Sequence, residues 1–314
     1  MPELILHHYP VSPFAEKVRV MLGYKNLAWH SVMIPTVMPK DDLLALTGGY
    51  RKTPVLQIGA DIYCDTALIA DVLEHLQPLP TLYPEPSKGM ARMLAQWADN
   101  TLFWTAMAYN LQPAGLAQMF AKAPPEAVAA FRADRGAMST GMMRIRPNDA
   151  AAAYKSYLRR LSDMLDDRPY LLGQVPCIAD FAMAHPLWFT QHRTPALAGI
   201  FDVFPAVVDW LASIRAIGHG KFEVMDCAEA LAVAAAAEPS ALHPEAVFQN
   251  EHGIALGSQV SINAELFGTE PTEGELVAAT RMTYTLRRSD SRAGTVHVHF
   301  PRIGYVLKEV VRAG

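Results

Sequence analysis

The sequence predicts an α/β domain, then an all-helical domain, then a small β-rich, barrel-like domain. Three observations predict this order. Short apolar runs alternate with helical patterns over residues 1–78, helical apolar spacing continues over 79–238, and period-two alternation with regular glycines fills 239–314. A length of 314 residues agrees with two or three domains, and a hydrophobic content of 51% provides for a sizeable core.

The first region is a predicted βαβ unit followed by a ββα unit. The expected strands cover 3–7, 28–33, 55–58 and 61–64, and the expected helices cover 14–22, 41–46 and 68–76. This order predicts a compact mixed sheet with helices packed on it.

The second and third regions differ in their sequence patterns. A proline-rich segment at 76–89 predicts a linker, and Pro186 predicts a kink or break in the helical region that follows. In the last region, Val296, Val298 and Phe300 alternate with polar residues, which is typical of a strand with one buried face. Several such runs predict a small barrel.

Composition excludes several classes of function. The formal net charge is −4, without a long basic run, so we expect no nucleic-acid partner. The longest small-apolar run, 230–237, is far shorter than a membrane span, and the first residues do not resemble a signal peptide. Three widely spaced cysteines predict no disulfide framework. These features predict a soluble, cytoplasmic protein.

The pair Ser12-Pro13 stands where the first strand passes into the first helix. Serine is a preferred N-cap and proline suits the first helical turn, so capping alone explains the pair. A hydroxyl at a helix N-terminus can also donate to an anion, aided by free N–H groups and the helix dipole. Both interpretations remain open at this point.

Two further stretches suggest a peptide-like ligand. Pro54 immediately precedes a strand, and a cis bond there would turn the backbone groups of Thr53 outward, where an extended peptide could pair with them. Asp65 and Thr66 open the next helix, where either can be its N-cap. The same two residues would also suit an α-amino acid end, since a carboxylate binds an ammonium and a helix N-terminus with a hydroxyl binds a carboxylate.

These stretches, together with LLGQVPCIADFAMAHPLWF in the helical region, resemble the cytosolic glutathione transferases. The resemblance covers the first two regions and implies a thioredoxin-like first domain. It implies that Ser12 is the catalytic residue, which would stabilise the glutathione thiolate. The glutathione-binding residues that it implies are Lys52, Thr53, Pro54, Asp65 and Thr66.

The resemblance implies a detoxification-type transferase that conjugates glutathione, its co-substrate, to a small apolar electrophile. It also implies a homodimer and no metal. One alternative is a non-catalytic glutathione-fold binding or interaction protein with the β-rich tail as its working part. Another is a glutathione-dependent thiol reductase or peroxidase, although a serine cannot form the mixed disulfide that a cysteine would.

The sequence departs from the family pattern in several places. Cys177 replaces the usual Ser or Thr at one helix start, and Thr47-Gly48-Gly49-Tyr50 replaces the familiar Asn-Pro. His8, rather than Tyr9, falls nearest the tyrosine of other classes, so a tyrosine-type mechanism is not expected. The tail lies outside the pattern.

The tail itself gives two expectations. His297 and His299 share a strand face, as metal ligands can, but no acidic partner lies at convincing spacing, so a solvated face is the ordinary explanation. We expect the tail to pack on the helical domain as a separate module and to leave the glutathione cleft open. A chain ending near Pro239 should then stay folded.

Overall fold

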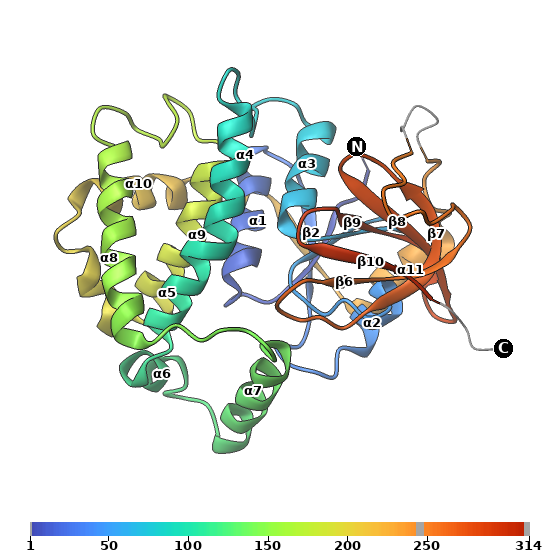
Figure 1. The fold of residues 1–314 in the computed structure, drawn as a ribbon, viewed down its shortest axis with the longest axis horizontal. Coiled ribbons are helices and arrows are strands. Elements are labelled where there is room, and N and C mark those ends of the chain that lie inside the picture. Colours follow the sequence, from blue (N-terminus) through green and yellow to red (C-terminus); the bar gives the residue numbers. More distant parts are fainter. Residues whose placement is uncertain (1, 243–247, 311–314) are drawn as a thin grey trace.

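The computed structural model describes residues 2–242 and 248–310, and its strands form one continuous ten-stranded sheet. The strand order is β10-β6-β7-β8-β9-β4-β3-β1-β2-β5. Figure 1 shows the helical domain on the left and the tail strands on the right, with the first domain between them. Among the described helices, none combines the length and apolar character that a membrane crossing requires.

The first domain has the predicted order of elements. They are β1 (Ile5–His8), α1 (Pro13–Tyr24), β2 (Trp29–Met33), α2 (Asp41–Thr47), β3 (Val55–Ile58), β4 (Asp61–Cys64) and α3 (Thr66–Leu76). Strand β1 pairs in parallel with β2 and antiparallel with β3, and β4 completes the hairpin with β3. The mixed α/β sheet is therefore confirmed.

The second domain is helical, as predicted. Its elements are α4 (Lys88–Trp97), a π-helical turn (Ala98–Leu102), α5 (Phe103–Asn110), α6 (Pro113–Met119), α7 (Pro125–Met138), α8 (Pro147–Met164), α9 (Ile178–Arg193), a 3₁₀ segment (Pro195–Phe201) and α10 (Pro205–Ala216). Pro186 lies inside α9 without ending it. Cys177, which replaces the usual Ser or Thr, is the N-cap of α9, and the buried Asp180 carboxylate accepts from its backbone N–H at 2.9 Å.

The chain returns to the first domain before the tail begins. Strand β5 (Phe222–Met225) pairs in parallel with β2, and α11 (Cys227–Ala236) packs beside α2. Within α11 the carbonyl of Ala230 accepts from Gln57 Nε2 at 2.8 Å. The sequence placed these residues in the helical region because β5 has only four residues, lies at the edge of the sheet and is largely exposed.

The tail is β-rich, as predicted, but its place is not the predicted one. Its strands are β6 (Gln259–Ala264), β7 (Thr272–Ala279), β8 (Thr283–Asp290), β9 (Gly294–Pro301) and β10 (Tyr305–Glu309). Strand β9 pairs in parallel with β4, so the tail continues the first-domain sheet in a linear strand order. The expectation of a separate module on the helical domain is wrong. A chain ending near Pro239 would expose the edge of β4, so its independent folding is no longer expected.

One apolar core lies across this junction. Ile62 of β4 is opposite Val298 of β9, and both are fully buried in a cluster that also contains Val55 and Leu286. These side chains come from both sides of the junction, so the first-domain sheet and the tail share one core.

We expect the junction to unfold with the rest of the sheet. Ile62→Ala should lower the free energy of unfolding by about 2–5 kcal/mol, because the buried side chain leaves a cavity between β4 and β9. The matched control Ile303→Ala, at a side chain that is 65% exposed, should change it by less than about 0.5 kcal/mol. Urea unfolding would be followed by tryptophan fluorescence and by circular dichroism. Two separate transitions in the wild type would contradict a shared core.

Candidate functional site

Ser12 occupies the predicted place at the start of α1. It is 3% exposed, and its Oγ accepts from the backbone N–H of Ala15 at 3.2 Å. The capping interpretation therefore describes an observed contact. That bond uses the oxygen as an acceptor, so the hydroxyl proton is still available to an anion.

Thr53 lies two residues before β3, and its peptide bond to Pro54 is cis. The Thr53 Oγ1 accepts from Lys40 Nζ at 3.3 Å, and the same ammonium donates to the carbonyl of Arg51 at 3.0 Å. Among residues 2–242 and 248–310, no backbone group forms a hydrogen bond with the N–H or C=O of Thr53. Burial lowers the pKa of Lys40 to about 8, so a fraction of this side chain is neutral near physiological pH.

The side chains of Asp65 and Thr66 already have partners within the chain. Asp65 caps α3 through Oδ1, which accepts from the Ala67 N–H at 2.9 Å, and its Oδ2 accepts from the Tyr305 hydroxyl at 3.0 Å. The Thr66 hydroxyl accepts from Lys17 Nζ at 3.1 Å. Both residues are at the helix start, as predicted, but a group from β10 occupies the free oxygen of Asp65.

Lys52 is enclosed by aromatic rings. Its ammonium lies 5.3 Å from the centre of the Tyr50 ring and 4.9 Å from the centre of the Tyr305 ring, which is within the range of cation–π attraction. Burial lowers the pKa of Lys52. A Cβ at Gly268 would lie 3.2 Å from Lys52 Cγ, so the tail packs against the stem of this lysine.

The segment between β6 and β7, which we call the β6–β7 loop (residues 265–271), contacts both other domains. Glu270 pairs with Arg51 Nη2 at 2.5 Å, and Arg51 Nη1 pairs with Asp134 of α7 at 2.7 Å. The N–H of Gly268 donates to the Met138 carbonyl at 2.9 Å. The tail therefore does not leave the predicted cleft open, and that expectation is wrong.

A second contact of the β6–β7 loop is apolar. The Phe267 ring meets the ring of Trp104 on α5 edge to face, with centres 5.0 Å apart. From the sequence alone, Trp104 could line an apolar pocket for a second substrate or pack in the helical core. In this structure its partner is a side chain of the tail.

Tyr9 and His8 have different surroundings. The Tyr9 hydroxyl is 3.2 Å from Arg135 Nη2 of α7, and burial raises the pKa of Tyr9. His8 is 2% exposed and contacts Arg19 at Nδ1 and Ser31 at Nε2. Since arginine only donates, Nδ1 accepts and the proton is on Nε2. His8 thus has a buried structural role, whereas the Tyr9 ring lies 5.5 Å from the ammonium of Lys40.

A buried ion network that the sequence analysis missed lies behind Thr66. Lys17 Nζ is 2.6 Å from Asp99 Oδ2, and Asp99 Oδ1 is 3.0 Å from His185 Nε2. Burial by itself raises the pKa of Asp99, but Lys17 and His185 outweigh it and hold that pKa below its ordinary value. The sequence carries one sign of this network, because Lys17 is a charged residue among the buried positions of α1.

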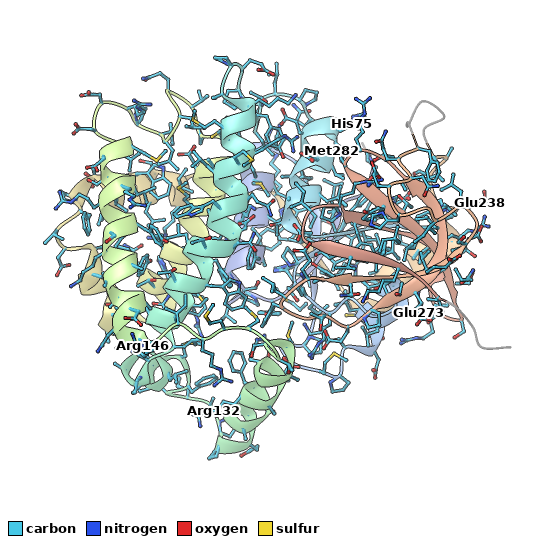
Figure 2. All side chains as sticks on the ribbon, in the orientation of Figure 1. His75, Arg132, Arg146, Glu238, Glu273 and Met282 are labelled. Carbon is cyan, nitrogen blue, oxygen red and sulfur yellow. The ribbon has the colours of Figure 1, made fainter. Side chains whose placement is uncertain are left out.

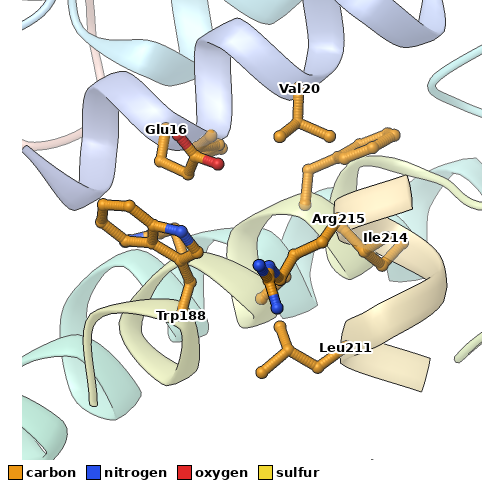
Figure 3. A pocket seen from close by; sticks show the side chains of 10 residues that line it. Glu16, Val20, Trp188, Leu211, Ile214 and Arg215 are labelled. Carbon is orange, nitrogen blue, oxygen red and sulfur yellow. The ribbon is translucent and has the colours of Figure 1, made fainter. Parts of the chain in front are cut away.

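The small pocket in Figure 3 lies between α1, α9 and α10, and Lys17 and His185 of the buried network also line it. Glu16 and Val20 line it from α1, and Trp188 and Arg215 line it from the other helices. Its volume is about 10 Å³, which is room for about one water molecule and not for a substrate.

Comparisons with known proteins agree with this geometry. A family model described as "Glutathione S-transferase, N-terminal domain" matches residues 6–81, and one described as "Glutathione S-transferase, C-terminal domain" matches residues 95–213. A solved GST-like protein from Pseudomonas syringae is 41% identical, with a TM-score of 0.83, over 99% of this chain and 100% of that one. The chain therefore belongs to the glutathione S-transferase family. Since the match spans nearly the whole chain, the relative from P. syringae shares the tail.

Two more distant relatives add context. FtsZ-localized protein A from Caulobacter vibrioides is 23% identical over 187 residues, which cover 58% of this chain and 75% of that protein. A glutathione S-transferase from Methylobacterium radiotolerans, solved with glutathione sulfonate, is 19% identical with a TM-score of 0.50, over 71% of this chain and 97% of that one. At this identity the second likeness concerns the fold alone.

Buried neutral histidines beneath the site predict a pH-dependent stability. Burial lowers the pKa of His7 to about 4, and burial with the nearby Arg19 charge lowers that of His8 to about 3, whereas Glu16 acts in the opposite direction. An unfolded histidine titrates near 6.5, so the unfolded state binds more protons below that pH. Stability is therefore complete above about pH 6.5 and is lost as the pH falls toward these folded values.

Between pH 7 and pH 5 we expect a loss of about 2 kcal/mol per buried histidine. His7→Gln should remove about half of the joint effect of His7 and His8, while His75→Gln, at an exposed position of α3, should leave the wild-type slope. Urea unfolding at several pH values measures this. Equal slopes for wild type and His7→Gln would contradict the assignment.

Proposed function

We propose that this chain is a non-catalytic member of its family, a binding or interaction protein whose glutathione site holds its own tail. The observation that carries the proposal is the hydrogen bond from the Tyr305 hydroxyl to Asp65 at 3.0 Å. Asp65 is the residue to which the family resemblance assigns the γ-glutamyl ammonium, and here a donor of β10 takes that place.

The charges of the tail support the same proposal. Glutathione would present an ammonium at one end and a carboxylate at the other. The tail presents a hydroxyl donor to Asp65 and the Glu270 carboxylate to Arg51, next to Lys52. It thus offers the cleft a hydrogen-bond donor where the ligand would place its ammonium, and a carboxylate near the place of the ligand's carboxylate. Glutathione bound in the family manner would have to displace them.

The name of one relative agrees with this proposal. FtsZ-localized protein A is named for where it lies in relation to another protein and not for a reaction. If the β-rich tail binds a partner protein, the first domain would serve to hold the tail in place.

A second candidate function is conjugation of glutathione to a small apolar electrophile, with Ser12 as the catalytic residue. It is favoured by the Ser12 hydroxyl at the N-terminus of α1 and by the backbone groups of Thr53, which have no backbone partner among the described residues. A free thiol has a pKa near 8.5, and lowering it by about 1.5–2 units would make the thiolate dominant at neutral pH. Glutathione would be the co-substrate, and a homodimer and a cytoplasmic location remain part of this proposal.

The test compares the wild type with two variants that loosen the tail. A Cβ at Gly49 would lie 1.9 Å from the Pro271 carbonyl oxygen, so Gly49→Ala should push the β6–β7 loop away. Tyr305→Phe removes one hydrogen bond to Asp65, worth about 1.5–3 kcal/mol, and keeps the ring over Lys52. Gly136→Ala is the matched control, because a Cβ there meets nothing within 4 Å.

We expect calorimetry to detect no glutathione binding to the wild type or to Gly136→Ala at millimolar ligand. Both loosening variants should bind glutathione at least tenfold more tightly. Conjugation of a generic aromatic electrophile should be at background for the wild type. Steady wild-type turnover that Ser12→Ala abolishes would overturn the proposal in favour of the second candidate, and wild-type oxidation of glutathione by a peroxide would favour reductase chemistry.

A further inference from the structure

A cluster of three metal-binding side chains lies where the tail joins the first domain. Asp61 of β4 and His297 and His299 of β9 each offer one ligand atom, and these atoms all lie within 4.8 Å of one another. The two histidines share a strand face, as the sequence predicted. The acidic partner that the sequence analysis did not find comes from a strand more than 200 positions away, through the pairing of β4 with β9.

The register explains why the three side chains meet. Asp61 is opposite His297, and Tyr63 is opposite His299. Side chains two positions apart on a strand point to the same face, so both histidines lie on the face of Asp61. The Tyr63 ring stacks on His299 with centres 4.6 Å apart, which fixes the plane of that imidazole.

We propose that Asp61, His297 and His299 bind one divalent transition-metal ion, for which Zn²⁺ is the best match. Two imidazoles and one carboxylate are a common ligand set for zinc, with the remaining position taken by water. His299 Nε2 lies 2.9 Å and His297 Nδ1 lies 3.8 Å from Asp61 Oδ1. Ligand atoms at ~2.0–2.1 Å from a tetrahedral ion lie roughly 3.3–3.4 Å apart, so small rotations suffice.

His297 supports the proposal through its burial and its ring nitrogen Nδ1. Its side chain is nine-tenths buried, and its Nδ1 has no hydrogen-bond partner among the residues that the structure describes. A buried nitrogen without a partner is costly, and an ion between it and Asp61 would satisfy it. Burial lowers the pKa of His297, so the ring is in the neutral form that a metal requires.

The other two ligands are held in place by neighbours. Asp61 Oδ2 accepts from the Ser240 N–H at 2.9 Å, and Thr285 Oγ1 lies 3.0 Å from His299 Nδ1. The Thr285 hydroxyl can accept from Nδ1–H once Nε2 binds an ion, which is the usual outer support of a metal-bound histidine. Burial alone raises the pKa of Asp61, but its bonds with His299 and Ser240 outweigh it and keep that pKa low.

One of the three proposed ligands also borders a pocket. His297 lines an open pocket of about 610 Å³ between the segment after α11 and the faces of β7, β8 and β9. Glu238, labelled at the outer edge of the tail in Figure 2, lines the same pocket. Arg287 also lines it, with its charge matched by Glu275 at 2.6 Å. An ion could therefore enter and keep a water ligand on the pocket side.

The test uses the tag-free full chain after treatment with a chelator, titrated with Zn²⁺ in a calorimeter. We expect one zinc per chain with a micromolar or tighter Kd, and a melting temperature that rises by several degrees with zinc. His297→Gln and Asp61→Asn should each weaken binding at least tenfold. His75→Gln, at an exposed position of α3 (Figure 2), should bind as the wild type does.

The alternative is a purely structural ion pair between Asp61 and His299. Within the described part of the chain His297 makes no hydrogen bond through Nδ1, so His297→Gln should leave the melting temperature of the metal-free protein within a few degrees. If the wild type shows no stoichiometric zinc binding, or binds it no better than His297→Gln does, the cluster is an ion pair and the proposal is wrong. The result does not depend on glutathione, so it stands or falls separately from the proposed function.

Discussion

The parallel pairing of β4 with β9 is the constraint on which the rest of the structure depends. Strand β4 would otherwise end the first-domain sheet with a row of unpaired backbone groups. Pairing with β9 covers that edge and brings Ile62 against Val298 in a common core. It attaches the tail to the first domain, and at the other end of the tail strands the Tyr305 hydroxyl of β10 donates to Asp65.

The departure from the family pattern at Thr47-Gly48-Gly49-Tyr50 has its explanation at this junction. The Tyr50 N–H donates to Thr272 Oγ1 at 3.1 Å, and that hydroxyl donates to the Thr47 carbonyl at 3.0 Å. Only a residue without a Cβ lets the Pro271 carbonyl approach at Gly49. The segment that would carry Asn-Pro has instead become a docking surface for the start of β7. A local sequence change and a distant added domain are therefore one structural feature.

The sequence predicted the elements well and their long-range arrangement poorly. Apolar periodicity reports which face of a strand or helix is buried, so the α/β order, the helical domain and the β-rich tail could be read from it. The positions of Ser12, Thr53, Asp65 and Thr66 at the starts of their elements followed from cap and proline preferences. Periodicity does not report which edge a strand will pair with, and so the docking of β9 on β4 could not be foreseen.

The same limit hid the partners of the predicted site residues. Tyr305 lies 240 positions from Asp65 in the sequence, and Asp99 lies 82 positions from Lys17. No local pattern links such residues, although each carries a local sign of its own: a lysine on an apolar helix face, or an alternating histidine pair on a strand. Such residues call for a partner because an isolated buried charge is costly, but the sequence alone does not say which residue supplies it.

The electrostatics of the cleft give a physical reason for a tail with these groups. Lys40, Arg51 and Lys52 bring three cationic groups to the start of β3, and burial lowers the pKa of both lysines. In an ordinary family member a bound anion could offset part of that charge. Here Glu270 pairs with Arg51 from the tail, and Asp134 pairs with it from the helical domain. If the tail takes the place of a ligand, as we propose, these ion pairs contribute to docking the third domain instead of to ligand binding. A partner that binds only the form with the docked tail would stabilise that form further. A ligand that needs the cleft would first have to offset the free energy of tail docking.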